Sequence, residues 1–490
     1  MKLTERIEYS AASLTDLIHI VVTGDTTQNV AGSSYKIPLS KLVALVPASS
    51  GSTNSYWTSG STGNYSVKTI NNSTIDATGD YSFAEGGGTL ASGFVSHAEG
   101  SGTTASGIGS HAEGGFTTAS GDTSHSEGLM TLAGGTQSHA EGSGTTASGA
   151  GSHSEGAYTI ASGDTSHAEG FYTIASGDAS HAEGYQTTAS EVASHAEGVE
   201  TIASGETSHA EGYQTIASGA GSHAEGIVTL AEGDGSHAEG NGSHATGNNS
   251  HAEGRDTLAS GDQSHAEGSG TTASGVISHA EGYKTTASGA YSHAEGRNTI
   301  ASGNTSHAEG RDTIAIGDQS HAEGKETTAM GDQGHAEGNG TIAMGDYSHA
   351  EGQGTTAMGD HSHAEGDSTL ASGNTSHAEG IFTKALGDYS HSEGSGTTAS
   401  GQASHAGGYK TTASGANSFV HGSGSTASGS NTIVLGANIT GTTSSTVYVN
   451  RLVINDINSY ATDGDADSDT NLPSGGVYKL NADRTLYIKP

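Results

Sequence analysis

The sequence predicts an all-β fold, a parallel β-roll solenoid built from coils of 14 residues, and two observations predict it. Histidine recurs at every fourteenth position from His97 to His405, in 23 consecutive registers. Glutamate recurs with the same period from Glu85 to Glu393, also in 23 registers, two places after the histidine position. A fixed period is typical of solenoids, in which each coil is buried only against its neighbours.

Each coil consists of two related halves. It reads Ser-His-Ala-Glu-Gly-x-x followed by Thr-x-Ala-Ser-Gly-x-x, and His237, His244 and His251 show that the halves are equivalent, because they follow at intervals of seven. Five residues are too few for a helix, and each half ends in glycine and polar residues. The pattern therefore predicts two short strands per coil joined by tight turns, with glycine supplying positive φ at the corner.

Alternation along the strands assigns their faces. In the first strand Ser96 and Ala98 share one face, and His97 and Glu99 share the other. In the second strand Thr103 and Ala105 form the repeated face. Small side chains in nearly every coil predict a narrow interior between the two strands.

The histidine and glutamate face is the candidate functional surface. A dry stack of carboxylates would cost several kcal/mol per residue, so this face meets water or other chains. Its uniformity favours an interface over a solvated pair copied by duplication, which is the alternative. The representative residues of this ladder are His97, Glu99, His111, Glu113, His167, Glu169, His251, Glu253, His307, Glu309, His377 and Glu379. Its ends are apolar, with Phe83 at the start and Phe419, Ile433 and Leu435 at the finish.

The repeats resemble the head repeats of trimeric autotransporter adhesins, the YadA-type heads. The segment Asn431-Thr432-Ile433-Val434-Leu435-Gly436 is similar to the core strand of that family, and the Ser-His-Ala-Glu-Gly units are similar to a polar version of it. The resemblance covers about residues 82–436. It implies that the roll is left-handed and that three rolls associate around a common axis. The histidine and glutamate residues replace the aliphatic residues of the family pattern.

Composition is consistent with a thin repetitive structure. Glycine contributes 78 of 490 residues, hydrophobic residues only 31%, and the formal net charge is −37. The strict period argues against the disorder that this composition would otherwise indicate. The acidic charge argues against nucleic-acid binding. The absence of cysteine excludes disulfides and thiolate sites.

Four regions are predicted. Residues 1–46 form an N-terminal attachment module with strands at 16–22 and 35–38 and a short helix at 39–46, and this pattern is similar to the first modules of bacteriophage fibre proteins. Residues 47–81 form a linker rich in Ser, Gly and Asn, and residues 82–436 form the β-roll rod. Residues 437–490 form a C-terminal tip or clasp with a strand at 446–454 and a β-hairpin at 476–488.

The sequence shows neither a signal peptide after Met1 nor an apolar stretch of eighteen residues. We therefore expect a structural fibre of a virus particle, made in the host cytoplasm, without insertion into a membrane. Its expected partners are two further copies of itself, other virion proteins through residues 1–80, and a receptor on the host surface. The alternative is a bacterial surface adhesin of the trimeric autotransporter type.

Other chemistries are weaker hypotheses. Histidine and glutamate on one face could bind a metal, but a hydrogen-bonded ladder explains them equally well, and we expect no metal or cofactor. The acidic run from Asp463 to Asp469 lacks the spacing of a calcium loop. The repeats contain no unique Ser, His and Asp set, so we expect no enzyme activity.

The protonation of the ladder stays open at this stage. A neighbouring carboxylate raises the pKa of a histidine, whereas burial lowers it. If the carboxylate effect is larger, stability falls as pH rises. If burial is larger, acidification weakens the fold instead.

Overall fold

The computed structural model describes residues 57–69 and 75–451 fully, together with Ala466. It also gives the backbone of β1 (Leu3–Glu8), β2 (Leu17–Val22), β3 (Ser33–Pro38), β60 (Ser459–Tyr460), β61 (Val477–Leu480) and β62 (Leu486–Ile488). The predicted helix at 39–46 and the acidic run lie outside the described residues. The chain divides into two compact units, Met1–Phe116 and Thr117–Pro490.

Every element with assigned bounds is a strand, so the predicted all-β class is confirmed. In the second unit, the first strands are odd-numbered and begin every 14 residues. The first two of them, β13 (His125–Ser126) and β15 (His139–Ala140), have two residues each. Those from β17 (His153–Ala157) to β57 (Ile433–Ala437) have five residues each. The second strands are even-numbered, have two residues each, and run from β12 (Thr118–Ala119) to β58 (Thr440–Gly441); β59 (Val447–Val449) follows.

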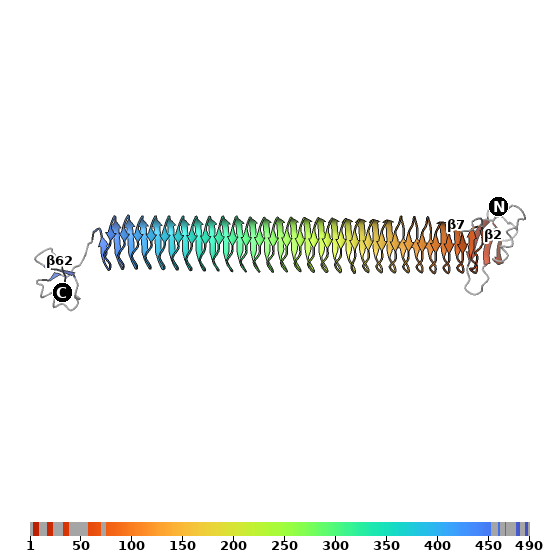
Figure 1. Ribbon diagram of the computed structural model, residues 1–490, viewed down its shortest axis with the longest axis horizontal. Coiled ribbons are helices and arrows are strands. Elements are labelled where there is room, and N and C mark those ends of the chain that lie inside the picture. The colour runs from red at the N-terminus through yellow and green to blue at the C-terminus, as the bar shows by residue number, and fades with distance from the viewer. Residues whose placement is uncertain are drawn as a thin grey trace. The chain divides into compact units, whose positions relative to one another are not determined.

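Within the second unit each coil pairs in parallel with the next coil, so the strands form two facing sheets, as Figure 1 shows for the coils drawn from yellow to blue. Strand β31 (His251–Arg255) pairs with β33 (His265–Ser269) so that His251 lies beside His265 and Glu253 beside Glu267. In the second-strand sheet, His244 lies beside Leu258, which confirms that the two halves are structurally equivalent. The predicted parallel β-solenoid of 14-residue coils is confirmed; its handedness stays a prediction.

The interior consists of small side chains, as the alternation predicts. Within one coil Ser250, Ala252, Thr257 and Ala259 are all buried, whereas His251 points to the outer face. The alanines from Ala161 to Ala385 form one continuous buried cluster. Because Ser, Thr and Ala are short, the two sheets can approach closely, and most of the interior holds no side chain larger than threonine.

Two kinds of glycine close the coil, for different reasons. Gly254 has φ +114°, and a Cβ on it would lie 2.2 Å from the carbonyl oxygen of Gly268 in the next coil. Gly261 is not at positive φ, but a Cβ there would lie 2.0 Å from the carbonyl oxygen of Gly275. Glycine also occupies corners at positive φ, as at Gly242 and Gly270 with φ +69° and +68°, so the expectation that glycine supplies positive φ at the corner is confirmed in some coils.

Many corners hold a non-glycine residue in the left-handed conformation. Asp256 and Gln263 adopt φ of 54° and 57°, one at each corner of the coil. Their backbone N–H groups donate to carbonyl oxygens fifteen residues earlier, from Asp256 to Asn241 and from Gln263 to Asn248, each at 2.8 Å. These bonds between coils offset the modest cost of left-handed non-glycine residues.

Buried threonines are satisfied differently from coil to coil. Ser154 replaces the usual alanine, and its hydroxyl lies 2.7 Å from the buried hydroxyl of Thr159. In a coil with alanine at that position, such as that of Ala252, the Thr257 hydroxyl has no hydrogen-bond partner.

We expect the Ser154→Ala substitution to weaken its coil by about 0.5–1.5 kcal/mol, because one buried hydrogen bond is lost. The converse substitution, Ala252→Ser, should stabilise its coil by supplying Thr257 with a partner. Hydrogen exchange of the amides in each coil measures both effects. Unchanged exchange in both variants would show that these hydroxyls contribute nothing.

The first unit begins with a hairpin rather than a coil. Strand β4 (Trp57–Ser59) pairs antiparallel with β5 (Val67–Thr69), and β5 pairs in parallel with β7 (Phe83–Gly87). The remaining fully described strands of this unit are β6 (Asp76–Ala77), β8 (Leu90–Ala91), β9 (His97–Ser101), β10 (Thr104–Ala105) and β11 (His111–Ala112). The range 47–81, predicted as a linker, therefore contains β4, β5 and β6.

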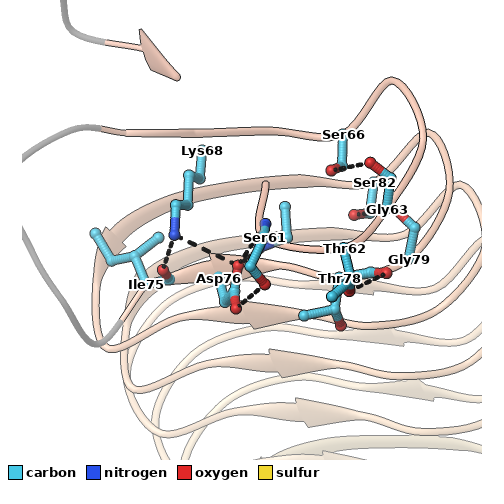
Figure 2. Close-up of polar contacts among 11 residues, drawn as sticks. Ser61, Thr62, Gly63, Ser66, Lys68, Ile75, Asp76, Thr78, Gly79 and Ser82 are labelled. Carbon is cyan, nitrogen blue, oxygen red and sulfur yellow. Dashed lines mark hydrogen bonds and ion pairs between the residues drawn. The ribbon is translucent and has the colours of Figure 1, made fainter. Parts of the chain in front are cut away.

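A lysine covers the first coil of this unit (Figure 2). Lys68 stands beside Ala84, a buried interior position of the next strand. Its Nζ donates to the carbonyl oxygen of Ile75 at 3.1 Å and to Asp76 Oδ1 at 3.4 Å, and Asp76 also accepts hydrogen bonds from Ser61. Burial opposes ionisation of Asp76, but these bonds outweigh it and hold its pKa below the ordinary value. The ion pair closes an end of the interior that would otherwise stay open.

The short terminal segments agree partly with their predictions. Strands β61 and β62 pair antiparallel, which confirms the hairpin predicted at 476–488. Strands β2 and β3, at the positions of the two strands predicted at 16–22 and 35–38, also pair antiparallel. Strand β1 was not predicted. The strand expected at 446–454 is described only as β59, which pairs with β57 as a further coil strand. No helix in the described residues has the length and apolar character needed to cross a bilayer.

Candidate functional site: the histidine and glutamate ladder

The His/Glu ladder is the column of histidines from His97 to His405 and glutamates from Glu85 to Glu393 on the outer face of the first-strand sheet. The sheet positions these side chains, because parallel strands in register place identical residues directly above one another. Imidazole rings of successive coils stack, as His139 and His153 do with centroids 4.8 Å apart and planes 1° from parallel. The predicted ladder is therefore one continuous column within each unit.

Histidine and glutamate of the same coil lie close together without a standard hydrogen bond. From His97 Nε2 to Glu99 Oε2 the distance is 3.6 Å, and the corresponding distance is 3.9 Å for His251 and Glu253. The same distance is 3.9–4.0 Å in three further predicted pairs, His167 with Glu169, His307 with Glu309, and His377 with Glu379. Residues His111 and Glu113 occupy the same registers, and the ring of His111 stacks on that of His97.

The ladder is half-buried in a single chain. The side chains of His251 and Glu253 are 36% and 40% exposed. The Nε2 atom of His251, like that of most ladder histidines, is covered by surrounding atoms and has no hydrogen-bond partner within the chain. A covered polar nitrogen without a partner is unfavourable, and a second chain, an ion or water could supply that partner.

Burial has the largest effect on the pKa of twelve ladder histidines. It lowers their pKa below the ordinary value, and the charge of neighbouring histidines acts in the same direction, while the glutamates only partly oppose it. The histidines affected are His195, His209, His237, His265, His279, His307, His321, His335, His349, His363, His377 and His405. Burial and the charges of Glu253 and Glu225 raise the pKa of Glu239.

The ends of the ladder are apolar, as the sequence indicates. In the first unit the ring of Phe83 lies 4.8 Å from that of Trp57 and 4.9 Å from that of His97, so Trp57 extends the column, which the sequence analysis did not foresee. In the second unit Phe419 packs on His405 at 4.7 Å. Beyond it, Ile433 and Leu435 are 39% and 42% exposed.

The sequence analysis also missed a break in the ladder. Gly407 stands where every earlier coil has glutamate, and His421 occupies the glutamate position of the next coil. The signal was present in the sequence as the single interruption of the glutamate register between Glu85 and Phe419, but its consequence depends on contacts between coils.

Comparison with known families supports the resemblance seen in the repeats. A family model for two copies of the YadA head domain repeat matches residues 168–190, 196–222, 252–276, 280–306, 308–333 and 336–362. These six segments are similar to YadA head domain repeats. All the matched segments lie in the second unit, and each includes at least part of a ladder strand. No curated protein matches the chain.

Proposed function

We propose that this chain is the subunit of a trimeric, adhesin-like fibre, in which the coils form a spacer and display structure without enzyme activity. The observation that carries this proposal is the run of YadA head domain repeats between residues 168 and 362. Repeats of this kind are typically homotrimeric. A stack of coils with an interior of Ala, Ser and Thr buries little apolar surface, and association of three chains supplies more.

The His/Glu ladder is the face we assign to the contact between chains. It holds one composition through 22 coils, from His97 and Glu99 to His391 and Glu393, and its C-terminal end exposes Ile433 and Leu435 at the same registers. Covered Nε2 atoms without a partner, such as that of His251, would find acceptors on a second chain. An interface explains both the constancy of the polar registers and the replacement by apolar residues at the ends.

The corners are the surfaces we assign to outside partners. Unlike the ladder, they vary from coil to coil and expose aromatic residues, among them Tyr158, Tyr172 and Tyr389. The rings of Tyr158 and Tyr172 stack at 5.1 Å, so they form a solvent-exposed aromatic edge. Exposed aromatic side chains are enriched at protein contact sites, which supports a role in recognising a host surface.

Such a fibre would be carried by a virus particle or by a bacterial surface. We favour the virus particle, to which residues 1–80 would attach the fibre. The N-terminal strands β1, β2 and β3 form a small sheet suited to such an attachment module. Fractionation of virions and of cell envelopes from the native source, with an antibody against the coils, distinguishes the two carriers. Recovery only in the envelope fraction would contradict the virion assignment.

We expect the full-length chain to have a mass three times the 48.5 kDa of one chain in light scattering at micromolar concentration. The double substitution Ile433→Asp and Leu435→Asp should shift the mass toward one chain, because it places charge in the apolar end of the contact. The matched control is Ile174→Asp with Ile300→Asp, two similarly exposed residues on the opposite sheet. A mass of 48.5 kDa for the unaltered chain contradicts the proposal.

A further inference from the structure

The break in the His/Glu ladder creates a cluster that differs from every regular coil. Gly407 has no side chain, and a Cβ on it would lie 2.6 Å from His421 Nδ1 and 2.7 Å from Glu393 Oε1. The space that a ladder glutamate fills elsewhere is therefore taken by two polar groups from neighbouring coils. Glycine at this position allows His421 and Glu393 to approach each other.

The ring stack also changes at this point. The planes of His377 and His391 differ by 12°, whereas those of His391 and His405 differ by 62°. The rotation brings His405 Nε2 to 3.3 Å from Glu393 Oε1, the shortest histidine–glutamate contact among the ladder ion pairs of the described residues. His421 Nδ1 lies 3.8 Å from the same oxygen.

A second carboxylate lies beside this group. Glu379 contacts Glu393, and its Oε1 lies 3.7 Å from His391 Nε2. Glu365, Glu379, Glu393 and His421 line an open hollow together with Gly380, Gly394 and Gly408. Three carboxylates and the imidazole of His421 thus border a space that solvent ions can enter, and His405 contacts one of these carboxylates, that of Glu393.

We propose that Glu393, His405 and His421 bind one divalent transition-metal ion of the zinc class, with Glu379 as the fourth ligand. Bonds from zinc to imidazole nitrogen and carboxylate oxygen are about 2.0–2.2 Å long, so neighbouring ligands of a tetrahedral site lie about 3.3–3.5 Å apart. The contact between His405 and Glu393 already has this length, and His421 Nδ1 lies 3.8 Å from the same Glu393 oxygen, a few tenths of an ångström beyond it. The mixture of imidazole and carboxylate suits zinc and its neighbours in the first transition series.

Regular coils offer a poorer arrangement. Sets such as His139, Glu141 and His153 also bring three potential ligand atoms within 4.8 Å of one another. Their rings are stacked almost parallel with centroids 4.8 Å apart. An ion midway between two such rings would lie farther from each ring nitrogen than the metal–nitrogen bond of about 2.1 Å. Both rings could therefore bind one ion only after the stack opens. The stack is already open between His391 and His405.

The test uses the full-length chain, stripped with a chelator and titrated with Zn²⁺ by equilibrium dialysis and calorimetry. We expect one tight site per chain and, with Co²⁺ as a probe, the absorption of a tetrahedral ion. Glu393→Gln and His421→Leu should each weaken binding by at least about tenfold, since even groups that only orient ligands contribute that much. His421→Leu places at this register the residue that the next coil carries as Leu435, so the fold should be retained.

The matched control is Glu253→Gln, which removes a glutamate from a coil whose His251 and His265 rings stack 3° from parallel. This variant should keep the tight site unchanged. All the proposed ligands come from one chain. The proposal is overturned if the unaltered chain lacks a tight Zn²⁺ site, or if Glu393→Gln and His421→Leu bind Zn²⁺ as well as the unaltered chain does.

Discussion

Gly254→Ala is expected to destabilise its coil by at least about 3 kcal/mol, since it combines an unfavourable backbone conformation with a collision. The φ of +114° lies in a region that L-residues rarely adopt. The added Cβ would also lie 2.2 Å from the carbonyl oxygen of Gly268, which is backbone and cannot rotate away. The two coils must separate locally, and parallel hydrogen bonds on both sides of the substitution would weaken.

A glycine-to-asparagine exchange at a corner provides the control. Gly340 has φ +69°, and a Cβ there meets no atom closer than 4.0 Å. Asparagine already occupies this corner conformation at Asn298 with φ 54°. Gly340→Asn should therefore change the stability by less than about 0.5 kcal/mol. Thermal unfolding and hydrogen exchange measure both variants, and equal stability of Gly254→Ala and the unaltered chain would refute the close-approach argument.

The period and the alternation of the sequence were sufficient to predict the solenoid and its faces. Successive side chains of a strand point to opposite faces of the sheet. Ala252 and its equivalents must therefore lie inside when His251 and its equivalents lie outside. The position of the histidines and glutamates in one column follows from the 14-residue period and parallel pairing. No knowledge of distances was needed for either inference.

Other properties required the coordinates. Corner residues such as Asp256 adopt positive φ although many residue types occur there, so their sequence contains no signal for that conformation. The break at Gly407 is visible in the sequence, but the approach of His421 to Glu393 joins residues 28 positions apart. The pKa of His349 depends on whether burial or the surrounding carboxylates have the larger effect, and composition cannot rank two opposing effects.

The protein is expected to lose stability on acidification, and this is the second large effect. Burial holds the folded-state pKa of twelve ladder histidines below the ordinary histidine value of about 6.5. The unfolded chain therefore binds more protons than the folded chain once the pH falls below about 6.5, and the free energy of unfolding decreases. Stability should be constant at higher pH and fall from about pH 6.5 downward through the lower folded-state pKa values. Association of chains through the ladder would bury its histidines further, lower their pKa further and so increase the loss of stability on acidification.

Thermal unfolding between pH 5.5 and 8 in a chelating buffer measures this dependence, and we expect the melting temperature to fall by several degrees over the acidic half of the range. The triple variant His335→Phe, His349→Phe and His363→Phe should show a smaller fall, because Phe419 shows that the column accepts phenylalanine beside His405. A melting temperature that rises on acidification would mean that the carboxylates, not burial, control the histidines. A flat profile would place the ladder in full contact with water, where exposed pairs contribute little, and would remove the main argument for using this face to join three chains.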